Sequence, residues 1–306
     1  MAVALAERQG LVFGGRTHVM GVINLTPDSF SDGGRINGAD QALRAAQRMV
    51  SQGASVLDLG AQSTRPGAEA IGAEAELARL LPALVRIRSA LPQVLLSIDT
   101  FRAPVAAAAL EAGADWINDV SGGRQDPELL AVAARWGCPL VLMHSRGDSR
   151  SMDGLTAYGD LVDDVITELE DASGRARAAG VAPSQLIWDP GLGFAKTEVQ
   201  CLALLHGLAR LRAQGHPLLV GPSRKRFIGA VLAEPRPRAR LWGTAAVVCQ
   251  AISAGADIVR VHDVGPIVQT ARMADALWRP VPSPNQQLNS RLTGLPQGFR
   301  TAVQEP

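Results

Sequence analysis

The amino-acid sequence predicts an α/β protein built as a single (β/α)8 TIM barrel, and three observations favour this fold. Short apolar runs rich in Val, Ile and Leu alternate eight times with Ala/Leu-rich stretches that have helical spacing. Such alternation is typical of a parallel sheet in which a helix follows each strand. Several of the expected helices stop at a glycine directly before the next strand. No linker divides the sequence near its middle, as the rival fold, an open doubly wound sheet in two domains, would need.

Each expected strand is an apolar run that ends in a Gly-rich or polar turn. In chain order the strands cover residues 18–25, 56–61, 95–100, 116–120, 139–144, 186–190, 217–222 and 258–263. The helices follow at residues 39–52, 69–90, 103–111, 127–136, 158–179, 198–214, 244–254 and 266–278. The expected glycine stops are Gly53, Gly113, Gly137, Gly180, Gly215 and Gly255.

Three segments lie outside this rhythm. We expect residues 1–17 to form a short N-terminal extension and residues 18–279 to form the barrel. The tail at 280–306 holds four prolines before Gly298 and has no sustained periodicity, so we expect it to be flexible. Residues 234–240 read EPRPRAR, which predicts a solvated loop, with a phosphate-binding arm as the alternative.

Charge and composition exclude several classes of protein. The 30 Lys and Arg residues nearly balance the 29 Asp and Glu residues, which gives no basic surface for nucleic acid or an anionic membrane. With 47% hydrophobic residues, the chain has the composition of a folded protein. The three cysteines are scattered, which favours a reducing cytoplasm over a secreted disulfide scaffold. The apolar start ends at Glu7, and no run is long enough to span a bilayer.

Polar side chains gather where the expected strands end, which is where such barrels carry their active sites. One Asp or Asn after a strand is often only a helix cap. Capping does not explain the same polar ending on all eight strands. The residues at these ends include Asn24, the run 62–67, Asp99, Asn118, His144, Asp189, the run 223–225 and the run 260–263. For His144 a structural and a functional role are both open.

Two chemical sets can be separated within this group. The cationic set suits a phosphate group and comprises Arg65, Lys225, Arg260 and, when protonated, His262. Asn24 opens a Gly- and Ser-rich loop and could complete a Mg2+ shell that phosphate oxygens and water fill. The acidic set, Asp99 and Asp189 with Asn118, could be an acid/base pair or could recognise a flat, amide-rich heterocycle. The sequence has no Walker or dinucleotide glycine pattern, and no His/Cys metal cluster.

These strand-end residues lie in runs that resemble the dihydropteroate synthase family of pterin-binding barrels. The similarity extends in order from about His18 to Trp278. It is carried by GVINLTPDSFSDGG from Gly21, STRPG from Ser63, SIDT from Ser97, INDVSGG from Ile117, LMH from Leu142, DPGLGFAKT from Asp189, SRKRFIG from Ser223 and RVHD from Arg260. One departure is Gln62, where the family often has Glu.

The resemblance implies a transferase of folate biosynthesis. It would condense 6-hydroxymethyl-7,8-dihydropterin diphosphate with 4-aminobenzoate to give 7,8-dihydropteroate and pyrophosphate. It implies pterin binding by Asp99, Asn118, Asp189 and Lys225, and diphosphate binding by Asn24, Thr64, Arg65, Arg260 and His262. It implies an aminobenzoate site at Pro66, Phe194, Ser223 and Lys225. Asp99, Lys225, Arg260 and His262 would be catalytic, Asn24 would hold Mg2+, and the chain would form a homodimer through its late helices.

Two other functions remain open from the residues. A pterin-binding methyltransferase domain on the same barrel would handle methyltetrahydrofolate, but it would not need Arg65 or the group at 223–225. A non-catalytic pterin-binding relative would be expected to lack a site residue, and none is missing here.

Overall fold

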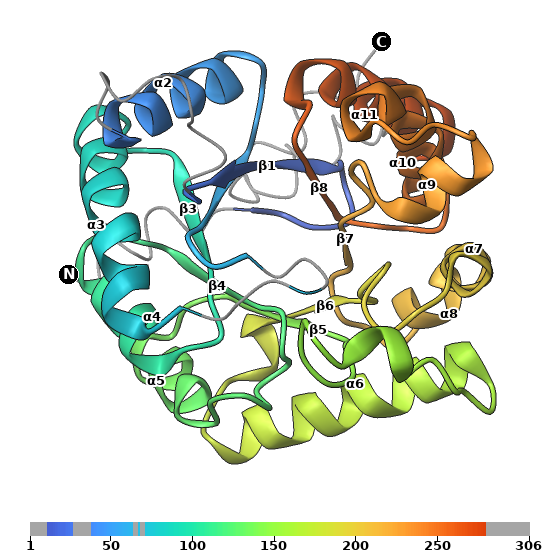
Figure 1. Cartoon of the computed structure of the whole chain (residues 1–306), viewed down its shortest axis with the longest axis horizontal. Helices are drawn as coiled ribbons and strands as arrows, with labels where there is room; N and C mark the ends of the chain where they lie inside the picture. Colours follow the sequence, from blue (N-terminus) through green and yellow to red (C-terminus); the bar gives the residue numbers. More distant parts are fainter. Residues whose placement is uncertain (1–10, 27–37, 64–66, 68–70, 280–306) are drawn as a thin grey trace, which may run out of the picture.

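The structure is a computed structural model that describes residues 11–26, 38–63, 67 and 71–279. It confirms the (β/α)8 barrel and all eight expected strands (Figure 1). The strands are β1 (His18–Asn24), β2 (Val56–Gly60), β3 (Leu95–Asp99), β4 (Trp116–Asp119), β5 (Leu140–Met143), β6 (Leu186–Asp189), β7 (Leu219–Val220) and β8 (Ile258–Val261). β7 is shorter than expected, because Pro217 and Pro222 flank it and neither can donate a backbone hydrogen bond.

The eight strands are parallel and follow one another around the barrel. Their order is β6-β5-β4-β3-β2-β1-β8-β7, and a bridge between Trp188 and Leu218 joins the two ends of this sheet. The first and last strands of the chain also pair: Met20 of β1 is in register with Arg260 of β8 on one side and with Val56 of β2 on the other. All carboxyl ends therefore lie at the same end of the barrel, as the predicted site requires.

The helices surround the strands (Figure 1). They are α2 (Gly38–Ser51), α3 (Ala73–Ala90), α4 (Ala103–Glu111), α5 (Glu128–Trp136), α6 (Leu161–Ala178), α7 (Glu198–His206), α8 (Leu208–Arg212), α9 (Arg226–Val231), α10 (Leu241–Ser253) and α11 (Val264–Trp278). Short 3-10 turns add η2 (Met152–Gly154), η3 (Pro183–Gln185) and η4 (Pro237–Arg240). The six predicted glycine stops all have positive φ, between 61° and 104°.

Two helix predictions need correction. The single helix expected at 198–214 is two helices that meet at Gly207. A Cβ atom there would lie 2.5 Å from Val162 of α6, so the close approach of α6 requires glycine. The sequence did not predict α9. Its six residues are too few to show a helical period.

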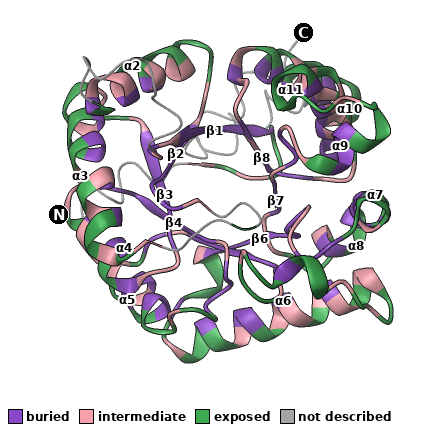
Figure 2. Ribbon diagram, in the orientation of Figure 1, coloured by how far each residue is buried: buried purple, intermediate pink, exposed green. Residues whose placement is uncertain are grey.

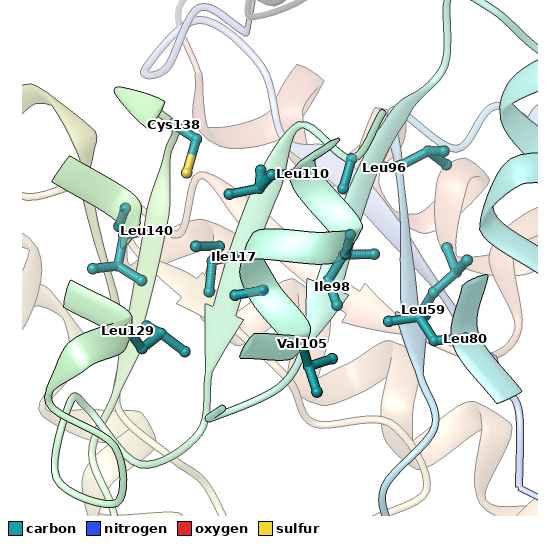
Figure 3. Packing of buried hydrophobic residues seen from close by; sticks show 14 of the residues in the cluster. Leu59, Leu80, Leu96, Ile98, Val105, Leu110, Ile117, Leu129, Cys138 and Leu140 are labelled. Atoms are coloured by element: carbon teal, nitrogen blue, oxygen red, sulfur yellow. The ribbon is translucent and has the colours of Figure 1, made fainter. Parts of the chain in front are cut away.

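Two apolar layers hold the barrel. The outer layer lies between strands and helices and includes Leu59, Ile98, Ile117 and Leu140 (Figure 3). Figure 2 shows the strands as the most buried part of the molecule. The inner layer fills the lumen near the amino ends with one side chain from each strand: Met20, Val56, Leu95, Trp116, Val141, Ile187, Leu219 and Ile258.

The segment before β1 covers the amino end of this inner layer. Leu11 and Phe13 pack against the layer. The Gly14 amide donates to Asp257 Oδ1 at 2.9 Å, and the Thr17 hydroxyl donates to Asp275 Oδ1 at 2.7 Å. The lumen is therefore closed by side chains at this end. None of the helices in the described ranges is long and apolar enough to cross a membrane.

Candidate active site at the carboxyl ends of the strands

Above the inner apolar layer the lumen becomes polar. Side chains alternate along a strand, so residues two positions beyond the apolar layer face the lumen again. Asp58 follows Val56, Ser97 follows Leu95, and these two are in register on neighbouring strands. The lumen-facing set continues with Asp99, Asn118, Asp189 and Arg260. The strand periodicity thus brings the predicted pterin residues of three strands to one face.

Arg260 joins the predicted residues to a carboxylate that sequence analysis missed. Its Nε donates to Asp58 Oδ2 at 2.6 Å, and its Nη2 donates to Asp99 Oδ2 at 2.7 Å. Asn118 Nδ2 donates to the same Asp58 oxygen at 3.1 Å. The signal for Asp58 was a lone carboxylate within the apolar run VLDLG, two residues before the strand end.

The charges of this cluster influence one another. Burial raises the pKa of Asp99 to about 7, because the nearby Arg260 offsets that cost only in part and Asp58 adds to it. Burial opposes the charge of Arg260, yet the Asp58 and Asp99 carboxylates outweigh it and raise the pKa of the guanidinium. Burial also raises the pKa of Asp189, against a hydrogen bond from the Gly191 amide. The cluster therefore binds a proton more readily than free carboxylates do.

Lys225 and Phe194 meet beside this cluster. The Lys225 ammonium lies 4.2 Å from the centre of the Phe194 ring, a cation–π contact. Burial lowers the pKa of Lys225 to about 8, against the attraction of Asp189. Ser223 precedes Lys225 in the loop after β7, and its hydroxyl lies 2.9 Å from Nδ1 of His262. The structure therefore brings the predicted aminobenzoate residues Phe194, Ser223 and Lys225 to one side of the lumen.

A second arginine supports the loop that carries Lys225. Arg240 is buried, and it donates to the carbonyl oxygens of Arg224 at 3.0 Å and Lys225 at 3.3 Å. It also donates to the carbonyls of Glu234 and Pro235. The prediction of a solvated loop over 234–240 is therefore wrong for Arg240, because backbone carbonyls replace water around its guanidinium.

Asn24 and Gln62 lie near the mouth, each just after or at the end of a strand. Asn24 ends β1 in register with Gly60 and is partly exposed. Gln62 accepts from the Ile71 amide at 2.8 Å and donates to the Ser63 carbonyl at 2.7 Å, so its amide ties together two parts of this loop. A carboxylate could not make the second bond. Thr64, Arg65 and Pro66 lie outside the described residues.

A cavity of about 230 Å3 opens next to Phe194. Its wall includes Gln62, Phe101 and Arg146, from the segments that follow β2, β3 and β5. His144, whose role the sequence left open, is buried at the end of β5 and contacts Lys196. The structure thus places the cavity, Phe194 and the lumen cluster at one end of the barrel.

This arrangement matches known proteins along most of the chain. The family model described as pterin binding enzyme matches residues 20–262. A dihydropteroate synthase of Synechocystis is 52% identical over 267 residues, which cover 87% of this chain and 92% of that relative. The chain belongs to the dihydropteroate synthase family. Membership of this family makes the protein a transferase of folate synthesis.

Solved structures of the family have the same fold. The Clostridium difficile dihydropteroate synthase, determined in the presence of pteroic acid, superposes with a TM-score of 0.83 at 39% identity. The match covers 88% of this chain and all of that one. The Xanthomonas albilineans enzyme with 4-aminobenzoic acid gives a TM-score of 0.82 at 39% identity, covering 87% of this chain and 94% of that one.

Proposed function

We propose that the polar half of the lumen binds the pterin ring of 6-hydroxymethyl-7,8-dihydropterin diphosphate and that 4-aminobenzoate binds above it. The observation that carries this proposal is the gathering of Asp99, Asn118, Asp189 and Arg260 near Lys225 in a lumen that is closed at its amino end. Carboxylate and carboxamide groups suit the N–H and carbonyl edge of an amide-rich ring. The relatives solved with pteroic acid and 4-aminobenzoic acid support the same substrates.

The proposed reaction exchanges a C–O bond for a C–N bond. The arylamine nitrogen attacks the methylene carbon of the pterin, the carbon–oxygen bond to diphosphate breaks, and the amine loses one proton. The arylamine is a neutral nucleophile at pH 7, so positioning and charge stabilisation supply most of the rate. Asp99 would stabilise the positive charge that grows on the methylene. Because Arg260 neutralises part of the Asp99 charge, only the remaining part would act on the methylene.

The diphosphate would lie where the cations meet the mouth. Arg260 and His262 come from one strand end and face the same side. Thr64 and Arg65 are part of the proposal but lie outside the described residues. Arg260 is held by two carboxylates, so diphosphate binding would have to share or redirect its guanidinium.

Mg2+ fits this site as an ion that arrives with the diphosphate. Within the described ranges no three His, Cys, Asp or Glu side chains come together as a metal site. Asn24 offers one partly exposed carboxamide oxygen at the end of β1, which suits a hard cation whose other ligands are phosphate oxygens and water. When bound, the ion would offset charge on the leaving group.

The aminobenzoate would lie against Phe194, with Lys225 and Ser223 beside it. The aromatic ring and the ammonium already contact each other, which gives an apolar wall next to a positive charge for the carboxylate end. Pro66 is the other proposed wall and lies outside the described residues.

Turnover tests the function directly. Purified protein with the pterin diphosphate, 4-aminobenzoate and Mg2+ should form dihydropteroate and pyrophosphate. Asp189→Asn should lose pterin affinity sharply, because one carboxylate acceptor becomes an N–H donor, yet should change the free energy of unfolding by only about 1 kcal/mol. Calorimetry and thermal unfolding check both. An early-melting variant with normal pterin affinity would remove Asp189 from the pterin site.

We also propose a cytoplasmic homodimer. Cys138, Cys201 and Cys249 are free thiols, which suits a reducing compartment. Helices α9, α10 and α11 and the residue directly after α9 expose large apolar side chains, namely Val231, Leu232, Trp242, Met273 and Leu277. Exposed apolar surface of this kind favours association with a second copy. Trp242→Glu with Leu277→Glu should give a monomer in sedimentation, whereas Val199→Glu on α7, also highly exposed, should not.

A further inference from the structure

Lys196 is buried in a cage of three acceptors that the reaction above does not use. Its side chain lies in the turn between β6 and α7, and the residue is 5% exposed. Nζ lies 2.7 Å from His144 Nδ1, 3.2 Å from the Gly191 carbonyl and 3.1 Å from the Phe194 carbonyl. An ammonium has three N–H donors and no acceptor, so this cage matches its protonated form.

The cage fixes the state of His144. Because Lys196 can only donate, Nδ1 of His144 must accept and its proton must lie on Nε2. Burial lowers the pKa of this imidazole to about 4, which agrees with the neutral form. Nε2 lies 3.1 Å from Glu168 Oε2, an electrostatic contact without good hydrogen-bond alignment.

A second set of contacts links Glu168 to the turn that carries Lys196. Arg146 donates from Nε to Glu168 at 2.9 Å, and its guanidinium lies 3.8 Å from the centre of the Tyr158 ring. The Tyr158 hydroxyl donates to the Ala195 carbonyl at 2.9 Å. Tyr158, from the segment after β5, thus holds Ala195 directly, whereas His144 reaches Phe194 only through Lys196.

The turn needs such anchors because its backbone is constrained. Ala195 has a φ of 49°, in the left-handed region that a residue with a Cβ atom occupies at a cost. A Cβ atom at Gly191 would lie 1.8 Å from the carbonyl oxygen of His144, so the turn is pressed against the end of β5. A turn of this kind holds its shape only when its surroundings determine it.

The composition of the chain singles out the same residue. Of the 30 Lys and Arg residues, 28 are arginine, and the two lysines are Lys196 and Lys225. Both lie beside Phe194: one binds its carbonyl and the other contacts its ring. A compact ammonium can donate to three converging acceptors, whereas the larger planar guanidinium cannot enter the same cage.

We propose that Lys196, acting with neutral His144, is a positioning residue that holds Phe194 over Lys225 and so shapes the aminobenzoate subsite. The proposal rests on the proposed function of that subsite. The pterin side is held by backbone amides of the same segments, which side-chain substitutions at Lys196 and His144 leave in place: the His144 amide donates to the Asp189 carbonyl, and the Gly191 amide donates to the Asp189 carboxylate. Loss of the cage should therefore affect aminobenzoate more than pterin.

Steady-state kinetics of wild type, Lys196→Met and Lys196→Arg test this separation. Both variants should raise the KM for 4-aminobenzoate about tenfold or more, while calorimetric pterin affinity stays within about twofold of wild type. Arg210→Met, a change of an exposed arginine on α8, should leave both quantities unchanged. An unchanged KM in Lys196→Met would overturn the proposal.

Substitutions at His144 provide a second test that does not depend on Lys196 variants folding. His144→Asn places a carboxamide oxygen near the position of Nδ1 and should keep the KM close to wild type. His144→Leu removes the acceptor and should raise the KM as Lys196→Met does. Equal KM values for these two variants would contradict the cage. An inactive wild type would refute the proposed function instead, so the two failures are distinguishable.

Discussion

Arg260 balances two buried carboxylates with one side chain. It contacts Asp58 and Asp99 at 2.6 and 2.7 Å, and among the residues that the structure describes it is the cation that pairs with both. This means that a loss of substrate affinity in Arg260 variants includes the rearrangement of two released carboxylates. Stability and binding must therefore be measured together at this position.

We predict that Arg260→Leu lowers the free energy of unfolding at pH 8 by about 3–5 kcal/mol. The raised pKa of Asp99, about 7 even beside Arg260, means that the folded state favours its protonated form. Without Arg260 the pKa of Asp99 would be higher still, so the loss should grow as pH rises above 7 and should be smaller at pH 6, where the carboxyl binds a proton in both proteins. Urea unfolding at the two pH values measures this.

A matched double variant controls the interpretation. Asp58→Asn combined with Arg260→Leu removes one of the two carboxylates and should recover part of the stability at pH 8. Equal losses at both pH values, with no recovery in the double variant, would show that the carboxylates are not the cause.

The sequence predicted most of the described site, because strand periodicity and barrel geometry decide which residues face the lumen. Asp99, Asn118, Asp189 and Arg260 are brought together as expected. Asp58 could not be predicted from polar strand ends, because it lies in the middle of β2. Its two partners come from β4 and β8, which closure of the barrel brings near. Lys196 was missed because its cage consists mainly of backbone carbonyls, which sequence patterns do not show.

At the level of elements, η4 acts as a support for the loop between β7 and α9. Arg240 donates to four backbone carbonyl oxygens, of which those of Arg224 and Lys225 belong to this loop. Arg224 itself has a φ of 61° and is held further by two hydrogen bonds to Asp263. The Lys225 loop is thus fixed from two sides, and composition alone showed only that the supporting segment is charged and rich in proline.

We predict that Arg240→Met lowers the free energy of unfolding by about 2–4 kcal/mol, since four carbonyls lose a charged donor. Turnover should fall as well, because the position of Lys225 depends on the same carbonyls. Thermal unfolding and steady-state kinetics measure the two effects. Arg238→Met, at an exposed position of the same segment, is the control and should change neither. A stable, fully active Arg240→Met would remove η4 from this supporting role.

For the molecule as a whole, the two lysines make protonation directly observable. Protein labelled with 13C at lysine Cε should give two side-chain signals, which Lys196→Met assigns. Burial lowers the pKa of Lys196 to about 7 and that of Lys225 to about 8. The charged groups near Lys196 are Asp189, Glu168 and Arg146, with the Cys201 thiol, while Lys225 faces Asp189, Arg260 and Asp99.

We predict opposite pH trends for activity and stability from these groups. The KM for aminobenzoate should rise as pH passes through 7 to 8, because the ammonium that fills the cage loses a donor. Both pKa values are lowered on folding, so the unfolded chain binds more protons from about pH 7 to 10, and the free energy of unfolding should increase with pH there. Titration of the NMR signals near pH 10 would contradict both trends.

The closed amino end of the barrel affects the order in which the two substrates can bind. The inner apolar layer and the segment with Leu11 and Phe13 close the lumen at its amino end, so it opens at the carboxyl end alone. Whatever binds deep in the lumen has to enter and depart at the carboxyl end, where Phe194 and Lys225 lie. Aminobenzoate that arrives first would obstruct the pterin diphosphate, so an excess of the smaller substrate should slow turnover. Condensation removes this obstruction when the substrates bind in the productive order, because the pterin and the aminobenzoate then leave the lumen as one molecule.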